Sequence, residues 1–117
     1  MVRKIIFYES SSGLKPIEDF LDQLSSKQAR KVTWVLRLIE DLERVPSRYF
    51  KKMVNTEDLW EVRVVAGSNI FRLLCFFDGP NLLVLAHAFQ KKTQKTPKRA
   101  IKTAEERKRD YFRRKMK

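Results

Sequence analysis

Residues 59–77 read LWEVRVVAGSNIFRLLCFF, and this stretch decides the fold. Two runs rich in β-branched and aromatic residues, 59–65 and 70–77, flank the turn-forming residues 66–69. This pattern predicts two antiparallel strands joined by a short turn. Residues 78–80 (Asp-Gly-Pro) mark a second turn, and residues 81–90 predict a third strand of the same meander.

Side-chain alternation gives the first two strands one wholly apolar face and one charged face. We expect the apolar face to meet helices; it consists of Trp60, Val62, Val64, Phe71, Leu73, Cys75 and Phe77. Glu61, Arg63 and Arg72 then gather on the opposite face, within about 5–8 Å of one another. On the third strand, His87, Phe89 and Lys91 share a side with Leu83 and Leu85. The pattern leaves open which side of this strand joins the charged face.

Outside the meander, the chain begins with a predicted strand at residues 2–8 and a helix that starts near Pro16. Ser25 or Ser26 caps a second helix, in which Ser25 and Gln28 have the spacing of a capping box. The short link between the helices predicts an antiparallel hairpin. Residues 49–53 offer a further short edge strand. After a basic loop at 91–95, Thr96 caps a last helix at about 97–115, with Pro97 at its first position.

These elements predict a single domain over residues 1–117, of α+β class and order β-α-α-β-β-β-α. An antiparallel sheet packs on a helix hairpin, with the helices on one side of the sheet, and a basic C-terminal helix follows. A chain of 117 residues with 43% hydrophobic residues can bury one core. Trp34 and Trp60 are expected to belong to it.

The charge predicts an anionic partner. Lys and Arg number 26 against 14 acidic residues, and residues 91–117 hold 13 basic and 3 acidic residues. Nucleic acid is the first candidate partner, ahead of an acidic protein or a membrane surface. One histidine and one cysteine do not make a usual zinc site, so neither metal nor cofactor is expected. The apolar runs are too short to span a membrane and no signal peptide is expected, which predicts a cytoplasmic protein.

The charged face has the chemistry for RNA cleavage without a metal ion. Arg63, Arg72, Lys91 and Lys92 are candidates to hold and stabilise a phosphate. Glu61, His87 or a lysine of lowered pKa is a candidate general base. The residues expected to contact RNA are Lys91, Lys92, Lys95, Lys98 and Arg99. Simpler interpretations stay open: Glu61 as an ion-pair partner of either arginine, His87 as a core residue, and the lysines as a solvated loop.

Three segments together resemble a known family. They are LWEVR at 59–63, FR at 71–72 and HAFQKKTQKTP at 87–97, followed by a basic helix with Ala104 and the pair Asp110-Tyr111. Over nearly the whole chain they resemble the phage-derived HigB-like branch of the RelE/ParE toxin superfamily. The third segment is the most specific of them.

The resemblance implies a RelE-like fold, a cognate antitoxin of the helix-turn-helix HigA type, and metal-independent cleavage of mRNA in the ribosomal A site. The product would carry a 2′,3′-cyclic phosphate. By position, Arg72 is implied to hold the scissile phosphate with Arg63 beside it, and Lys92 to stabilise or protonate the leaving group. RelE itself has a lysine at the position of Glu61 and a catalytic tyrosine after the last strand, where residues 95–98 have none. The general base therefore stays open.

Two alternatives remain at this stage. ParE-like relatives share the fold but inhibit DNA gyrase by binding it, and the run at residues 91–97 argues against that branch. A non-catalytic, basic nucleic-acid-binding module would show salt-dependent binding without cleavage products.

Overall fold

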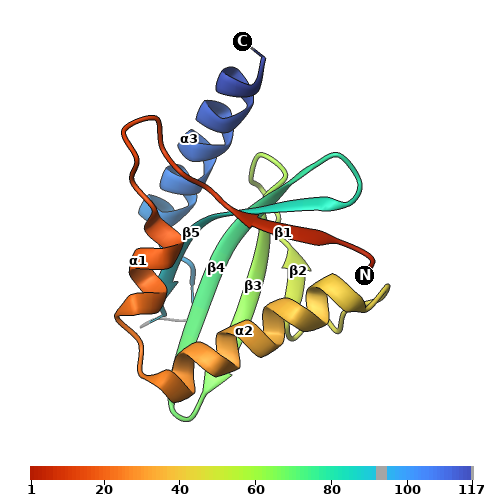
Figure 1. The fold of residues 1–117 in the computed structure, drawn as a ribbon, viewed down its shortest axis with the longest axis vertical. Helices are drawn as coiled ribbons and strands as arrows, with labels where there is room; N and C mark the ends of the chain where they lie inside the picture. The colour runs from red at the N-terminus through yellow and green to blue at the C-terminus, as the bar shows by residue number, and fades with distance from the viewer. Residues whose placement is uncertain (92–94, 117) are drawn as a thin grey trace.

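The structure, a computed structural model, describes residues 1–91 and 95–116 of the chain. Its class is α+β, as predicted (Figure 1). The elements are β1 (Lys4–Phe7), α1 (Pro16–Asp22), α2 (Ser26–Asp41), β2 (Phe50–Lys52), β3 (Trp60–Ala66), β4 (Asn69–Asp78), β5 (Leu82–Gln90) and α3 (Lys98–Lys115). The predicted order omits β2, which the sequence offers only as a further edge strand. Lys92, a predicted site residue, lies outside the described residues.

The five strands form one sheet in the order β1-β5-β4-β3-β2. The meander of β3, β4 and β5 is antiparallel, as its short turns predict. The expectation of a wholly antiparallel sheet is wrong, however, because β1 pairs with β5 in parallel. Local turns determine the direction of neighbouring strands in a meander, but they carry no information about the distant partner of the first strand.

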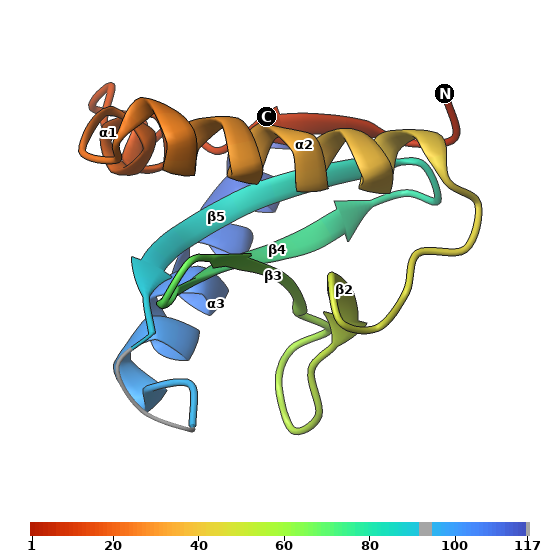
Figure 2. The ribbon, with the colours of Figure 1, turned by 90° about the horizontal axis from the view of Figure 1, so that it is seen from below.

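The first two helices begin where the sequence predicts. Pro16 opens α1, and Ser25 caps α2 in a capping box with Gln28. The predicted antiparallel hairpin is wrong. In Figure 2, α1 is seen nearly end-on while α2 lies across the view, so the helices cross at a steep angle. The two helices pack on different strands: α1 packs mainly on β5, while α2 packs on β3 and β1.

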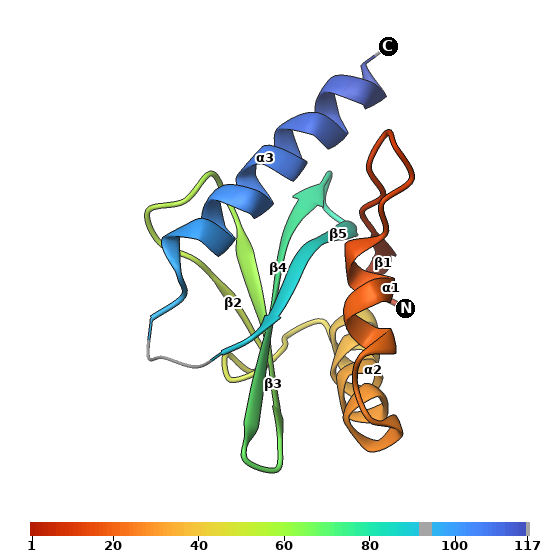
Figure 3. The same cartoon turned by 90° about the vertical axis from the view of Figure 1, so that its left-hand side faces the viewer.

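Both faces of the sheet carry helices. Figure 3 shows α1 and α2 on one side and α3 on the other. The first core joins α1 and α2 to the apolar face predicted from alternation; it includes Ile17, Val35, Ile39, Val62, Val64, Phe71 and Leu73. The second core joins α3 to the other face through Leu74, Phe76, Val84, Ala86, Ala100 and Ala104. The expectation of helices on one side only is therefore wrong, because the small apolar residues of α3 pack on the sheet.

The two tryptophans differ in burial. Trp60 is half-buried and packs against the first core, where its ring stacks on Phe50 at 4.7 Å. Trp34 is 46% exposed, so its predicted place in the core is wrong. Its ring meets the ring of Tyr49 edge-on at 5.8 Å instead of entering the core. No helix within residues 1–91 and 95–116 has the length and apolar character that crossing a membrane requires.

Candidate active site

An ion pair between Arg72 on β4 and Glu61 on β3 lies on the sheet face that α3 partly covers. Nη1 of Arg72 is 2.5 Å from Oε2 of Glu61, and the two side chains are only 7% and 12% exposed. Among the described residues, Nε of Arg72 is buried without a hydrogen-bond partner. Charges withdrawn from water in this way require close partners. Glu61 supplies one partner, while the Nε donor remains uncommitted.

Thr96 contributes to this pair instead of capping α3. Its hydroxyl donates to Oε2 of Glu61 at 3.1 Å. The helix begins at Lys98 with Pro97 as its N-cap, and no side chain caps it. The predicted cap is therefore wrong, because the hydroxyl is already bonded to a carboxylate.

Arg63 lies directly opposite Arg72 in the register of β3 and β4. Like charges at this position repel each other. Among the described residues, Glu61 is the only carboxylate paired with either guanidinium group. The cluster therefore keeps an excess positive charge that a phosphate would neutralise. The predicted grouping of these three residues, away from α1 and α2, is confirmed.

Lys91 extends the cluster at the end of β5. Its backbone N–H donates to the carbonyl of Ile70 at 2.7 Å. Burial lowers the pKa of the Lys91 ammonium, and the charges of Arg72 and Arg63 lower it further, while Glu61 opposes them. The ammonium therefore releases its proton more readily than an exposed lysine does.

A bulge decides which residues of β5 face the cluster. Leu74 pairs with His87 but Cys75 pairs with Leu85, so β5 has one extra residue between them. The expectation that His87 and Phe89 share a side with Leu83 and Leu85 is wrong for this reason. Leu83 and Leu85 belong to the first core, whereas Phe89 packs with the second. The bulge thus brings Phe89 to the position opposite Arg72.

His87 is held by Arg107 from α3. Nη1 of Arg107 lies 3.2 Å from Nδ1 of the imidazole and donates to the carbonyl of Ala86 at 2.8 Å. Burial and the charge of Arg107 lower the pKa of His87 to about 4. Arginine only donates, so Nδ1 accepts and the neutral ring carries its proton on Nε2. In this state His87 is suited to donate a hydrogen bond through Nε2.

A small pocket of about 220 Å³ opens beside the ion pair. Its lining includes Arg72, Glu61 and Thr96 together with Lys51 and Lys52 of β2. Lys51 lies opposite Glu61 in the register, so it belongs to the charged face. Sequence reasoning missed Lys51. The signal was its place next to the apolar Phe50 in the short edge strand, where alternation puts neighbours on opposite faces.

A second pocket, of about 440 Å³, lies between β5 and the start of α3. It is lined by His87, Phe89, Gln90, Pro97, Arg99, Ala100 and Thr103. The first turn of α3 holds Lys98 and Arg99 and no acidic residue. Cations there oppose the helix dipole, so a bound anion would be favourable. Of the residues predicted to contact RNA, Lys95, Lys98 and Arg99 are exposed.

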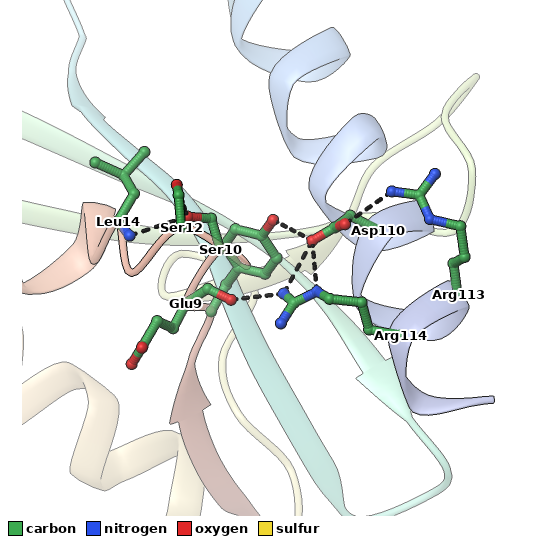
Figure 4. Close-up of polar contacts among 8 residues, drawn as sticks. Glu9, Ser10, Ser12, Leu14, Asp110, Arg113 and Arg114 are labelled. Atoms are coloured by element: carbon green, nitrogen blue, oxygen red, sulfur yellow. Dashed lines mark hydrogen bonds and ion pairs between the residues drawn. The ribbon is translucent and has the colours of Figure 1, made fainter. Parts of the chain in front are cut away.

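The far half of α3 is anchored through its own charges. Figure 4 shows Asp110 accepting from Arg113 and Arg114, and its Oδ2 also accepts from the Tyr8 hydroxyl at 2.5 Å. Tyr111 donates to Asp78 at 2.8 Å. Several cations that contribute to the positive charge of residues 91–117 are therefore bonded within the protein. In the described part of α3, the cations without such bonds lie toward its start, at Lys98, Arg99 and Lys102.

No group of three His, Cys, Asp or Glu side chains within the described residues could hold a metal ion.

A model of the family described as phage-derived Gp49-like proteins matches residues 19–109. A search of curated proteins finds no match. The matched range includes the ion pair, both pockets and the first two-thirds of α3.

Proposed function

Since the chain belongs to the phage-derived Gp49-like family, which is related to the RelE/HigB-like toxins, we propose that it is a toxin that cleaves mRNA on the ribosome without a metal ion. The observation that carries this proposal is the opposed pair Arg63 and Arg72, with only Glu61 to balance their charge among the described residues. Two guanidinium groups at one point of a sheet suit a backbone phosphate.

In the proposed reaction, the 2′-oxygen of a ribose attacks the adjacent phosphorus. The bond from phosphorus to the 5′-oxygen breaks, which leaves a 2′,3′-cyclic phosphate and a free 5′-hydroxyl. Arg63 and Arg72 stabilise the charge that develops on the phosphate oxygens. The phosphate competes with Glu61 for Arg72, and the freed carboxylate accepts the 2′-hydroxyl proton.

The 5′-oxygen requires a proton as it leaves. Lys91 suits this role, because its lowered pKa makes proton release easier. Lys92, which the resemblance implies for this step, is the neighbouring candidate. His87 would hold the substrate through its Nε2–H. Lys95, Lys98, Arg99 and Lys51 would contact flanking phosphates of mRNA or ribosomal RNA.

The family relation implies an antitoxin in general terms. We propose that it is a small helix-turn-helix protein of the HigA type, encoded beside this chain, and that the toxin acts on ribosomes in the cytoplasm. Co-purification of the product of the adjacent gene, together with relief of growth arrest when both genes are expressed, would support this proposal.

The decisive experiment is primer extension on a translated message with purified protein and ribosomes. Arg63→Ala is the informative variant, since Arg63 is half-buried and forms no ion pair with a described residue. We expect its cleavage rate to fall by about 10²-fold or more. Arg44→Ala, an exposed site on the loop after α2, is the control. Unchanged cleavage by Arg63→Ala would overturn the proposed site.

One observation favours the alternative of a non-catalytic nucleic-acid-binding module. Arg72 is almost wholly buried and already paired, so its guanidinium offers little surface to a ligand in this conformation. This alternative predicts binding that weakens steeply with salt. It also predicts no cut products with ribosomes at any protein concentration, which separates it from the nuclease.

A further inference from the structure

The outer edge of β3 is open over its second half. β2 pairs with β3 only as far as Val62, and Figure 3 shows no strand beside β3 on that side as it approaches the turn to β4. The N–H of Arg63 points to this edge, where it donates to the carbonyl of Tyr49 at 2.8 Å. Because strand backbones alternate, the N–H and C=O of Val65 point the same way. Among the described residues, neither group has a partner.

A groove lies beside this open edge, between α2 and the end of β3. Its volume is about 670 Å³. Trp34, Val65 and Ala66 supply its apolar surface. Trp34 is 46% exposed and Val65 50% exposed. Large apolar groups left in water around a groove are typical of a surface that a partner covers.

The rim of the groove is positively charged. Lys27, Arg30 and Lys31 of α2 line it, and no acidic residue does. Nζ of Lys31 lies 4.6 Å from the centre of the Trp34 ring. An apolar floor with a charged rim resembles a protein interface, in which aromatic and arginine residues contribute most of the affinity.

These features favour a polypeptide over a nucleic acid. An unpaired strand edge is recognised through backbone hydrogen bonds, which an extended peptide supplies and RNA does not. The exposed aliphatic side chain of Val65 also offers nothing to a base or a phosphate. The basic rim requires carboxylates on the partner.

We propose that this groove binds an extended, acidic segment of a partner protein. The segment adds a strand to β3 through the backbone of Val65 and places an apolar side chain on Trp34. Its carboxylates pair with Lys27, Arg30 and Lys31. Trp34 and the basic rim belong to α2, whereas the Arg72–Glu61 pair lies on the face that α3 partly covers, so this inference does not rest on the nuclease activity.

The probe is a displayed library of random peptides about ten residues long, selected on the full chain. We expect recovered peptides that alternate acidic and apolar residues. Their affinity should fall at least about tenfold for Trp34→Ala and for the double variant Lys27→Glu/Lys31→Glu. Lys4→Glu/Arg44→Glu, which changes the net charge equally at exposed sites elsewhere, should bind like the unmodified protein.

Hydrogen exchange of the Val65 amide provides the second measurement. Its exchange should slow when a recovered peptide is bound, because the added strand accepts a hydrogen bond from it. Failure to recover such peptides, equal binding by all variants, or an unchanged Val65 exchange rate would each overturn the proposal. So would a fluorescent oligouridylate whose binding depends on Trp34, since that result would make the groove an RNA site.

Discussion

Arg72 and Glu61 pair across neighbouring strands with their charged ends 2.5 Å apart and almost out of water. Arg63 stands opposite Arg72 and brings a second positive charge to the same place. The sheet therefore holds a cation whose only carboxylate partner among the described residues is shared with Thr96. Substitutions of this ion pair should therefore change both the free energy of unfolding and the activity of the proposed site.

Breaking the pair on one side should destabilise the protein more than replacing both partners. Arg72→Ala leaves the Glu61 carboxylate buried without its cation, which costs about 3–5 kcal/mol. The double variant Arg72→Met/Glu61→Gln removes both charges and should lose clearly less. Urea denaturation at pH 7 measures both free energies of unfolding. Equal losses for the two variants would show that the pair is solvated and not buried.

Arg72→Ala is therefore a poor test of activity, because it should also destabilise the fold. Loss of growth arrest in that variant would mix folding with activity. The double variant separates them, since we expect it to fold and yet to cleave no message. Arg63→Ala reports on activity without this complication.

His87 should titrate with a pKa of about 4, well below the ordinary histidine value of 6.5. Between these values the unfolded chain binds a proton that the folded chain does not. Stability contributed by neutral His87 is therefore present above pH 6.5 and is lost as pH falls toward 4. As the chain has one histidine, its NMR titration needs no assignment.

Arg107→Gln tests the cause of that shift. Loss of the neighbouring charge should raise the pKa of His87 part of the way back, since burial remains. Lys108→Gln, at the next position of α3, should leave it unchanged. A His87 pKa that does not change in Arg107→Gln would contradict the contact with Arg107.

Local sequence patterns predicted the features of the fold that depend on residues close together in the chain. Alternation placed Glu61, Arg63 and Arg72 on one face because both strands are regular there. It failed at His87, because nothing in the apolar run of β5 marks the bulge. Local patterns also could not predict the parallel pairing of β1 with β5 or the contact of Thr96 with Glu61. Both join residues that are far apart in the chain.

Asp110 should hold the far half of α3 against the rest of the fold. Asp110→Asn removes the charge that Arg113 and Arg114 contact and weakens the bond from Tyr8. We expect faster hydrogen exchange in α3, with little change in β3 and β4. Glu106→Gln, another acidic residue of the same helix, is the control. Unchanged exchange in α3 would mean that its apolar packing on the sheet is sufficient.

The same carboxylate gives a pH dependence. Hydrogen bonding from Tyr8, followed by contacts with Arg114 and Arg113, lowers the pKa of Asp110. A lowered carboxyl pKa stabilises the fold above the unfolded value, and that contribution is lost as pH falls through the folded pKa. Lowering the pH from 7 to below the ordinary aspartate pKa of 3.8 should therefore open α3 less in Asp110→Asn than in the unmodified protein.

Lys51 should contribute one phosphate contact to RNA binding. It is exposed, lines the pocket beside Arg72 and lies opposite Glu61 in the sheet. Each lost contact with single-stranded RNA lowers the slope of log affinity against log salt by about 0.7. We expect that change for Lys51→Ala and none for Lys4→Ala, an exposed lysine on β1. Lys51 is proposed to bind RNA and to take no part in the cleavage step. The cut positions on a message should therefore stay the same in Lys51→Ala, while the protein concentration needed for half-maximal cleavage rises. A shift in cut positions would instead place Lys51 against a base and would require a different path for the RNA across the sheet.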